Sequence, residues 1–297
     1  MNRDGRTAIA WASLAVSIAA LGLKYAAWAV SGSRALYSDA LETVINVVAA
    51  LGALWALQIA AAPPDENHPY GHDKAEYLSA VAEGVLVILT ALGIFMVAWK
   101  AWLHPAAHLE PWRGLAINLA AGVLNLLWAL NLKRASRIRR SPALLASSQH
   151  IMSDVWTTAG LVLGVVLIPL TGLVQIDAIL SALIGLNVLR NGFQMMQHSI
   201  AGLMDEAPDS QTLQQIRDVI ARNATGALEA HDLRARTVGR TSFIEFHLVV
   251  PGRMTVDNAH EICDRVENAL RAQVGRALIH IHIEPEEKAK HHGVVVL

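Results

Sequence analysis

The stretch "ALYSDALETVINVVAALGAL", residues 35–54, decides the fold of this chain, because it carries two carboxylates and an amide within an apolar run. Asp39, Glu42, Thr43 and Asn46 follow one another at i, i+3, i+4 and i+7, so they share one face of a helix. An ionised carboxylate at the centre of a bilayer costs roughly 2.5–3.5 kcal/mol on insertion scales. A partner that offsets this cost is therefore expected beside that face.

The composition around this stretch indicates a membrane protein. Of 297 residues, 54% are hydrophobic and 16% are charged, whereas soluble proteins average about 25% charged residues. The net charge is −1 and no large basic patch is present, so no nucleic-acid partner is expected. A single cysteine, Cys263, excludes an intrachain disulfide.

Six apolar segments each approach or exceed the ~20 residues that cross a bilayer, and the sequence predicts six spans at 7–30, 35–61, 77–103, 112–132, 144–171 and 176–200. The predicted loop "LKRASRIRR" (132–140) carries five positive charges. Such loops stay on the cytoplasmic side. With six spans, the N-terminus, the loop 61–76 and the C-terminus are expected on that side as well.

The chain becomes more polar after "GLMDEAPD" (202–209). The spacing of apolar residues predicts a helix at 210–224, strands at 228–239 and 241–250, a helix at 256–274 and a strand at 277–285. The order αββαβ predicts a small α+β domain, an open sheet with helices on one face. We therefore expect a six-span α-helical membrane domain at 1–204 and a cytoplasmic domain at 205–297, with a mobile tail.

A second polar face lies in span five, where "SSQHIMSDVWTT" (147–158) places His150 and Asp154 four residues apart. If this face opposes that of span two, Glu42, Asn46, His150 and Asp154 surround one cation. Two carboxylates, an imidazole and an amide oxygen suit a divalent transition metal. Hydrogen bonds between helices are the alternative for such residues. Asp39, nearer the outer end of its span, is interpreted as a mouth residue or a helix-end partner.

The chain resembles the cation diffusion facilitator family of metal–proton antiporters. The residues that carry the resemblance run through the whole chain: the span-two face, "PPDENHPYGHDKAE" (63–76), "HIMSD" (150–154), "HDLR" (231–234), "FIEFHL" (243–248), "NAHEICD" (258–264) and "IHIEP" (281–285). The resemblance implies a homodimer with six spans per subunit and a metallochaperone-like cytoplasmic domain. The compact length favours a bacterial inner membrane.

In this family the transport site takes two residues four apart on span two and two on span five. Counting back from the "YGH" loop assigns the span-two pair to Glu42 and Asn46, opposite His150 and Asp154. Bacterial zinc members typically have Asp-x-x-x-Asp or His-x-x-x-Asp at the span-two pair. This sequence differs at both positions, with Glu42 at the first and Asn46 at the second. Asn46 cannot take up a proton, so the metal preference and the number of protons stay open. A frame of Asp39 and Thr43 has the same spacing but fits the loop distance less well.

The resemblance implies three further features. The loop would hold a second metal site, formed by Asp65, His68 and His72. The cytoplasmic domain would hold a dimer-interface site, formed by His231, His247, His260, His282 and Glu284, while a role for His280 is open. A charge pair of Lys74 and Asp205 would tie the subunits at a hinge.

The sequence therefore predicts a transporter rather than an enzyme. It would export a divalent metal in exchange for protons, with zinc placed first and iron(II), manganese, cobalt, nickel or cadmium as alternatives. A non-transporting, membrane-anchored metal sensor is the competing hypothesis, and the polar faces inside the spans count against it.

Overall fold

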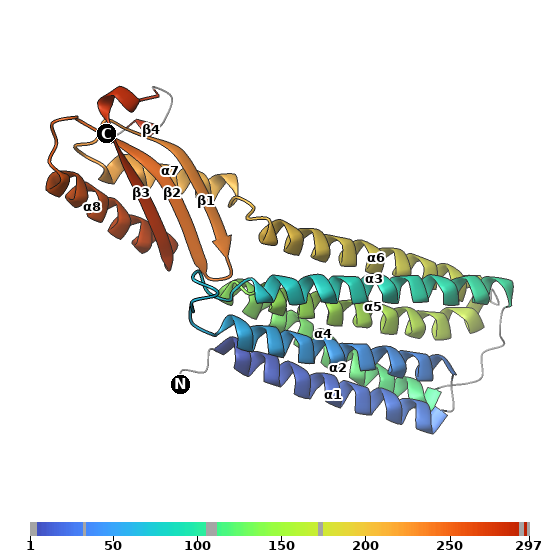
Figure 1. Cartoon of the computed structure of the whole chain (residues 1–297). Coiled ribbons are helices and arrows are strands. Elements are labelled where there is room, and N and C mark those ends of the chain that lie inside the picture. Colours follow the sequence, from blue (N-terminus) through green and yellow to red (C-terminus); the bar gives the residue numbers. More distant parts are fainter. Residues whose placement is uncertain (1–4, 32–33, 105–111, 172–174, 291–293, 296–297) are drawn as a thin grey trace. The chain divides into compact units, whose positions relative to one another are not determined.

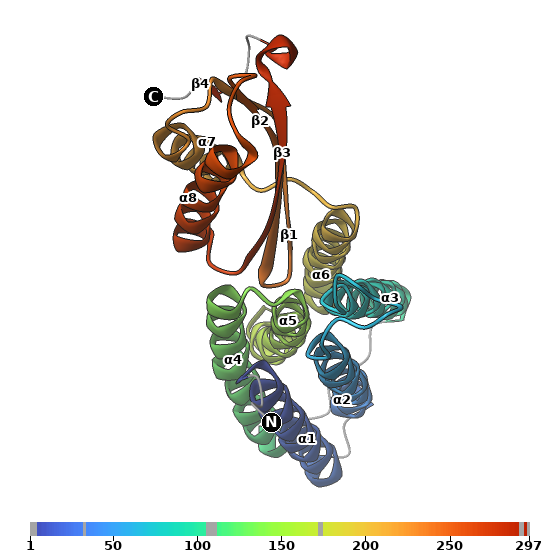
Figure 2. The same cartoon turned by 60° about the vertical axis from the view of Figure 1, so that its left-hand side comes forward.

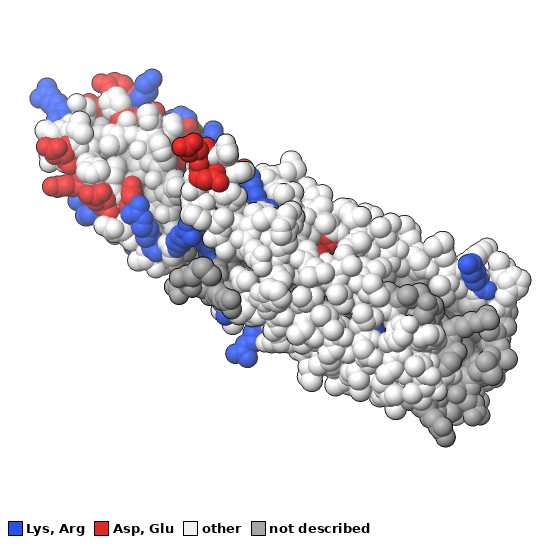
Figure 3. Space-filling view, turned by 60° about the horizontal axis from the view of Figure 1, so that its bottom comes forward, with Lys and Arg blue, Asp and Glu red and all other residues white. Residues whose placement is uncertain are grey.

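Figure 1 shows the computed structural model of the chain, which describes residues 5–31, 34–104, 112–171, 175–290 and 294–295. The chain divides into two compact units, Met1–Ile200 and Ala201–Leu297. In the face drawn in Figure 3, charged side chains gather on the second unit, and the helical unit shows few. This difference matches the change in composition along the sequence.

The first unit is built from long helices at the six predicted positions: α1 (Gly5–Ser31), α2 (Arg34–Ala60), α3 (Ala75–Leu103), α4 (Trp112–Arg139), α5 (Pro142–Thr171) and α6 (Gln175–Leu203). Each has 27 to 30 residues, and a helix of that length exceeds the ~30 Å hydrocarbon core. Length and hydropathy together mark membrane spans at Thr7–Ser31, Thr43–Ala60, Ala75–Leu103 and Gly114–Arg139. The prediction of a helical membrane bundle is confirmed.

The helices of the bundle pack through small residues. Helix α1 lies against α2 and α4, α5 against α3 and α4, and α3 against α2, as the end-on view of Figure 2 shows. Ala20, Ala27 and Ala129 are fully buried at these contacts, and such residues let helices approach closely in a membrane. Large apolar side chains such as Trp55 and Leu127 are instead exposed, which suits contact with lipid.

The basic segment 132–140 was expected to be a loop, and the structure corrects this. Helix α4 continues to Arg139, and α5 begins at Pro142. The hydroxyl of Ser141 accepts a hydrogen bond from the Leu144 N–H at 3.3 Å and so caps α5. A span ends where the lipid ends, but a helix continues until a residue stops it. Arginines in the last turn also suit the negative end of the helix dipole.

The second unit has the predicted αββαβ order: α7 (Ser210–Asn223), β1 (Glu229–Val238), β2 (Thr241–Val250), α8 (Val256–Val274) and β3 (Ala277–Pro285). The sheet order is β3-β2-β1-β4. Strands β1 and β2 form an antiparallel hairpin, and α8 connects β2 to a parallel β3. Strand β4 (Val294–Val295) pairs with β1, at a place where the tail was expected to be mobile.

The core of the second unit lies between the sheet and its two helices. Ile244, Phe246 and Leu248 alternate along β2 and are buried against α7 and α8. Figure 2 shows both helices on the same side of the sheet. The side chains between them, including His247, belong to the other face. The alternation therefore decides which residues form the core and which remain for a site.

Replacing Leu248, which is fully buried, tests this core. We expect Leu248→Ala to lower the free energy of unfolding by about 2–5 kcal/mol, because it opens a cavity. The measurement is urea unfolding of residues 205–297 produced alone. Leu278→Ala is the matched control: Leu278 is 49% exposed, and its loss is expected to cost under about 1 kcal/mol. Equal costs would contradict the assignment of the core face.

Candidate metal centres

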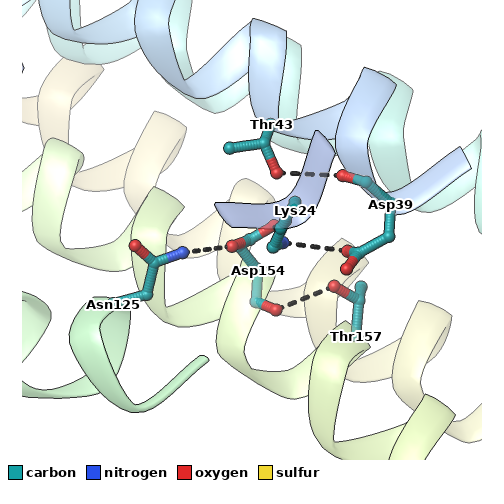
Figure 4. Close-up of polar contacts among 6 residues, drawn as sticks. All are labelled: Lys24, Asp39, Thr43, Asn125, Asp154 and Thr157. Carbon is teal, nitrogen blue, oxygen red and sulfur yellow. Dashed lines mark hydrogen bonds and ion pairs between the residues drawn. The ribbon is translucent and has the colours of Figure 1, made fainter. Parts of the chain in front are cut away.

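A buried ion cluster lies inside the helical bundle. The ammonium of Lys24, on α1, lies 2.9 Å from Oδ1 of Asp39 on α2 and 2.7 Å from Oδ1 of Asp154 on α5. Lys24 is 0% exposed, and the two carboxylates are 6% and 3% exposed. These are charge-assisted hydrogen bonds of ordinary length. Two carboxylates from different helices therefore converge on one positive charge (Figure 4).

Neighbouring polar groups complete the cluster. The amide of Asn125, on α4, donates a hydrogen bond to Oδ2 of Asp154. The hydroxyls of Thr43 and Thr157 donate to the backbone carbonyls of Asp39 and Asp154, at 2.9 and 2.8 Å. These hydroxyls are thus engaged on their own helices. Figure 4 shows that the cluster joins α1, α2, α4 and α5.

The structure places the predicted transport residues unequally. Asp154 is in the cluster, while Asn46 and His150 are buried, at 6% and 5% exposed. Nδ1 of His150 is buried with no hydrogen-bond partner among the described residues. Glu42 belongs to α2, but its side chain lies outside what the structure describes. Asp39, interpreted from the sequence as a mouth residue or a helix-end partner, is 6% exposed, and its carboxylate lies in the cluster.

Lys24 and Asn125 are part of the cluster, and the sequence analysis did not single them out. Lys24 had a usable signal: it is a lone lysine within the apolar segment of α1, and an ionisable residue inside a span calls for a partner. The sequence gives little indication of a special role for Asn125, because a single amide in an apolar helix often forms an ordinary hydrogen bond between helices.

A second set of buried carboxyls lies between α3 and α5. Glu76 accepts a hydrogen bond from the hydroxyl of Ser141, and Glu83 accepts one from Ser147 at 3.2 Å. Both glutamates are almost fully buried, at 0% and 2% exposed. They lie seven residues apart and so share one face of α3. These acids were not predicted as site residues.

The loop before α3 brings Asp65, His68 and His72 together. Oδ1 of Asp65 lies 3.2 Å from Nδ1 of His68, and Oδ2 lies 3.4 Å from Nε2 of His72. The two imidazole rings are 4.4 Å apart. The backbone N–H of His68 donates to Asp65 at 2.6 Å and is the main cause of the lowered pKa of that carboxyl. One ligand atom from each residue lies within 4.8 Å of the others, so the three can hold one metal ion.

The free face of the sheet carries a row of histidines. His231 on β1 pairs with His247 on β2, which pairs in turn with His282 on β3. The carboxylate of Glu284 lies 3.2 Å from Nε2 of His231 and 3.2 Å from Nδ1 of His247. Those two nitrogens still have no hydrogen bond of proper geometry among the described residues. Nitrogens close to a carboxylate without bonding to it suit a metal between them.

The row also includes Asp232, which the sequence analysis did not single out. Asp232 has φ 53° at an irregularity of β1, and it groups with His231 and His247 as a possible metal ligand. Lys290 donates to its carboxylate at 2.6 Å and lowers its pKa. Asp232 is therefore already engaged by a cation from the tail.

The other predicted residues lie apart from this row. His260 is 72% exposed on α8, 3.8 Å from Asp264, and α8 covers the opposite face of the sheet. His280 is exposed and pairs with Glu245 in the β2–β3 ladder. For the predicted hinge pair, Asp205 accepts from Arg236 at 2.6 Å, while Lys74 belongs to the first unit.

Carboxylates that converge on one cation inside a helical bundle are characteristic of membrane proteins that move ions. Comparison with known proteins identifies the family. Residues 10–204 match the family model of the cation efflux transmembrane domain, and residues 208–286 match that of the cation efflux protein cytoplasmic domain. The chain belongs to the cation diffusion facilitator family, a family of metal cation efflux transporters, as predicted.

Two full-length relatives agree with this assignment. A transporter of Synechocystis sp., sll1263, is 39% identical over 94% of this chain and 90% of its own length. The cation-efflux pump FieF of Shewanella oneidensis is 31% identical, over 92% of each chain. A solved structure of the zinc form of CzrB is 41% identical over 29% of this chain and 98% of its own, with a TM-score of 0.28.

The histidine row generates a prediction for the second unit. We expect zinc to stabilise residues 205–297, by about 2.7 kcal/mol at a hundred times the dissociation constant. His247→Ala is expected to remove most of this gain, because His247 occupies the centre of the row. Thermal unfolding with and without zinc measures the effect. His280→Ala is the control and should retain the stabilisation by zinc. If both variants lost this stabilisation, the metal site would extend along β3 to His280.

Proposed function

We propose that this protein exports a divalent metal cation from the cytoplasm in exchange for protons. One observation carries the proposal: carboxylates of α2 and α5 meet at a single cation within the bundle. The cation-efflux pumps among its relatives support the direction of transport. Metal and protons compete for the same lone pairs, so a site that faces the more acidic side loses metal and gains protons.

The proposed ligands of the transported metal come from both polar faces. Asp39 and Asp154 supply charge, and His150 supplies an imidazole that binds metal or a proton through the same nitrogen. Asn46 and Glu42, the span-two pair chosen from the sequence, lie on the same face of α2 as Asp39. Asp39 and Asp154 both contact the ammonium of Lys24, so Asp39 joins Glu42 as a candidate span-two carboxylate.

Zinc is the first proposed substrate, because an imidazole with oxygen ligands in a four-coordinate site suits it. The site offers no thiolate and only one histidine, so iron(II), manganese, cobalt, nickel and cadmium remain candidates. Transport would proceed by alternating access, in which the helices rock about a fixed site.

The cytoplasmic part would regulate this cycle. We propose a homodimer in the bacterial inner membrane with both termini in the cytoplasm. Metal at His231, His247, His282 and Glu284 would join the two cytoplasmic domains, with His260 as a further ligand. Asp65, His68 and His72 would bind metal at the entrance, and Lys74 with Asp205 would form the hinge.

Removing one carboxylate of the cluster tests the transport function. We expect Asp39→Asn to reduce metal uptake by more than the roughly 10–100-fold that loss of an outer-shell partner costs, because it removes a proposed ligand. The assay uses proteoliposomes that are acidic inside, with zinc and each alternative metal added outside and a pH-sensitive dye inside.

Two variants serve as comparisons for Asp39→Asn. Asp154→Ala should abolish uptake and the accompanying proton release. Glu42→Gln should retain most of the uptake if Asp39 is the ligand, and should abolish it if the span-two pair begins at Glu42. Absence of flux of every metal in the wild type, with metal still bound by the cytoplasmic domain, would instead support the sensor hypothesis.

Truncation tests the regulatory role. A chain that ends at residue 204 is expected to lose the activation of transport by cytoplasmic metal, because the histidine row is removed. The full-length His247→Ala variant should show the same loss if the row carries the effect. Uptake rates at increasing cytoplasmic-side metal measure it, and a truncated chain that is still activated would assign regulation to the membrane unit.

A further inference from the structure

Lys24 occupies the position at which the two carboxylates converge. Its ammonium lies within 2.9 Å of Oδ1 of Asp39 and 2.7 Å of Oδ1 of Asp154, and the side chain is completely buried. It reaches this point from α1, a helix that carries neither carboxylate (Figure 4). Lys24 is thus an internal cation held by the charges that the proposed function gives to the metal.

The ammonium and a divalent metal cannot both occupy this position. A metal binds carboxylate oxygens at about 2.0–2.2 Å and would use the same two oxygen atoms that now accept hydrogen bonds from Lys24. A metal between these oxygens would lie a few ångström from the ammonium, where like charges in a buried site repel strongly. One cation therefore displaces the other.

The chemistry of lysine suits displacement. An ammonium is a compact point charge on a flexible four-carbon stem, with three donors that rotate freely. Rotation about the bonds of this stem would carry the ammonium away from the carboxylates. A guanidinium would instead clamp a carboxylate through a planar fork, and a neutral side chain would leave two buried carboxylates without a cation.

We propose that Lys24 is a tethered competitor of the transported metal. It withdraws when metal binds and returns to Asp39 and Asp154 when metal leaves. Its return fills the cation position, so the carboxylates never remain unpaired during the cycle and release of metal is assisted. This inference rests on the proposed transport function. It adds Lys24 as a positioning residue that lowers the affinity for metal and speeds its release.

The test is a separation of KM from kcat in the full-length protein. Initial rates of zinc uptake into proteoliposomes are measured for the wild type and for Lys24→Met, which keeps the length of the stem and removes the charge. We expect KM to fall about tenfold or more, because the competitor is lost, and kcat to fall with it, because release is no longer assisted. Lys24→Arg should restore the KM of the wild type at least in part.

Other results would overturn the inference. If Lys24→Met leaves KM unchanged or raises it, Lys24 has only a structural role. Lys100→Met is the control, since Lys100 is an exposed lysine in the last turn of α3, and it should change neither constant. If the wild type carries no metal, the proposed function itself fails; a wild type that transports, with unchanged KM in Lys24→Met, rejects only the role of Lys24.

A second measurement uses only the wild-type protein, so it does not depend on whether a variant folds. The chain has six lysines, few enough to resolve their ammonium signals by NMR with ¹⁵N-labelled lysine. The Lys24 signal is expected to shift when zinc is added to the wild type, because its hydrogen bonds to both carboxylates break. An unchanged set of lysine signals at saturating zinc would reject the displacement.

Discussion

The constraint on which the membrane unit depends is the burial of Asp39 and Asp154 inside the helical bundle. Each ionised carboxylate in a low-dielectric bundle is costly unless a positive charge lies beside it. Lys24 supplies that charge from a third helix, and Asn125 satisfies the second oxygen of Asp154 from a fourth. The same contacts that make the carboxylates tolerable therefore also fix how α1, α2, α4 and α5 pack.

The second unit depends on a different constraint, the burial of one face of its sheet. Its small sheet must bury one face, and Ile244, Phe246 and Leu248 do so against α7 and α8. The period of two then sends His247 to the opposite face, where the register of the hairpin and of the parallel pair aligns it with His231 and His282. The candidate metal ligands are thus positioned by the core. A register slip of one residue in β2 would move His247 to the core face and separate it from His231 and His282.

Periodicity predicted the helices and the αββαβ order, because these features are local in sequence. The grouping of Asp65, His68 and His72 came instead from the resemblance to the family. Periodicity could not select the partner of Asp154. The contact through Asp39 depends on where α1 brings Lys24, and that is a tertiary fact. The extension of α4 to Arg139 was not predicted, because hydropathy indicates which residues lie in the bilayer and does not indicate where a helix ends.

The two ends of the cluster are not equivalent, and this suggests an order of events. Asp154 has both oxygens engaged, by Lys24 and by Asn125, whereas Oδ2 of Asp39 makes no hydrogen bond of proper geometry among the described residues and has the side chain of Asn118 close to its carboxyl group. In the proposed exchange, an arriving metal first meets Oδ2 of Asp39 and then takes the Oδ1 atoms of Asp39 and Asp154, which Lys24 releases. Binding would then begin on the α2 side and be completed on α5, where the metal takes the oxygen that Lys24 releases. An ordered exchange of this kind links entry of metal to departure of the ammonium and to the contact between the two helices.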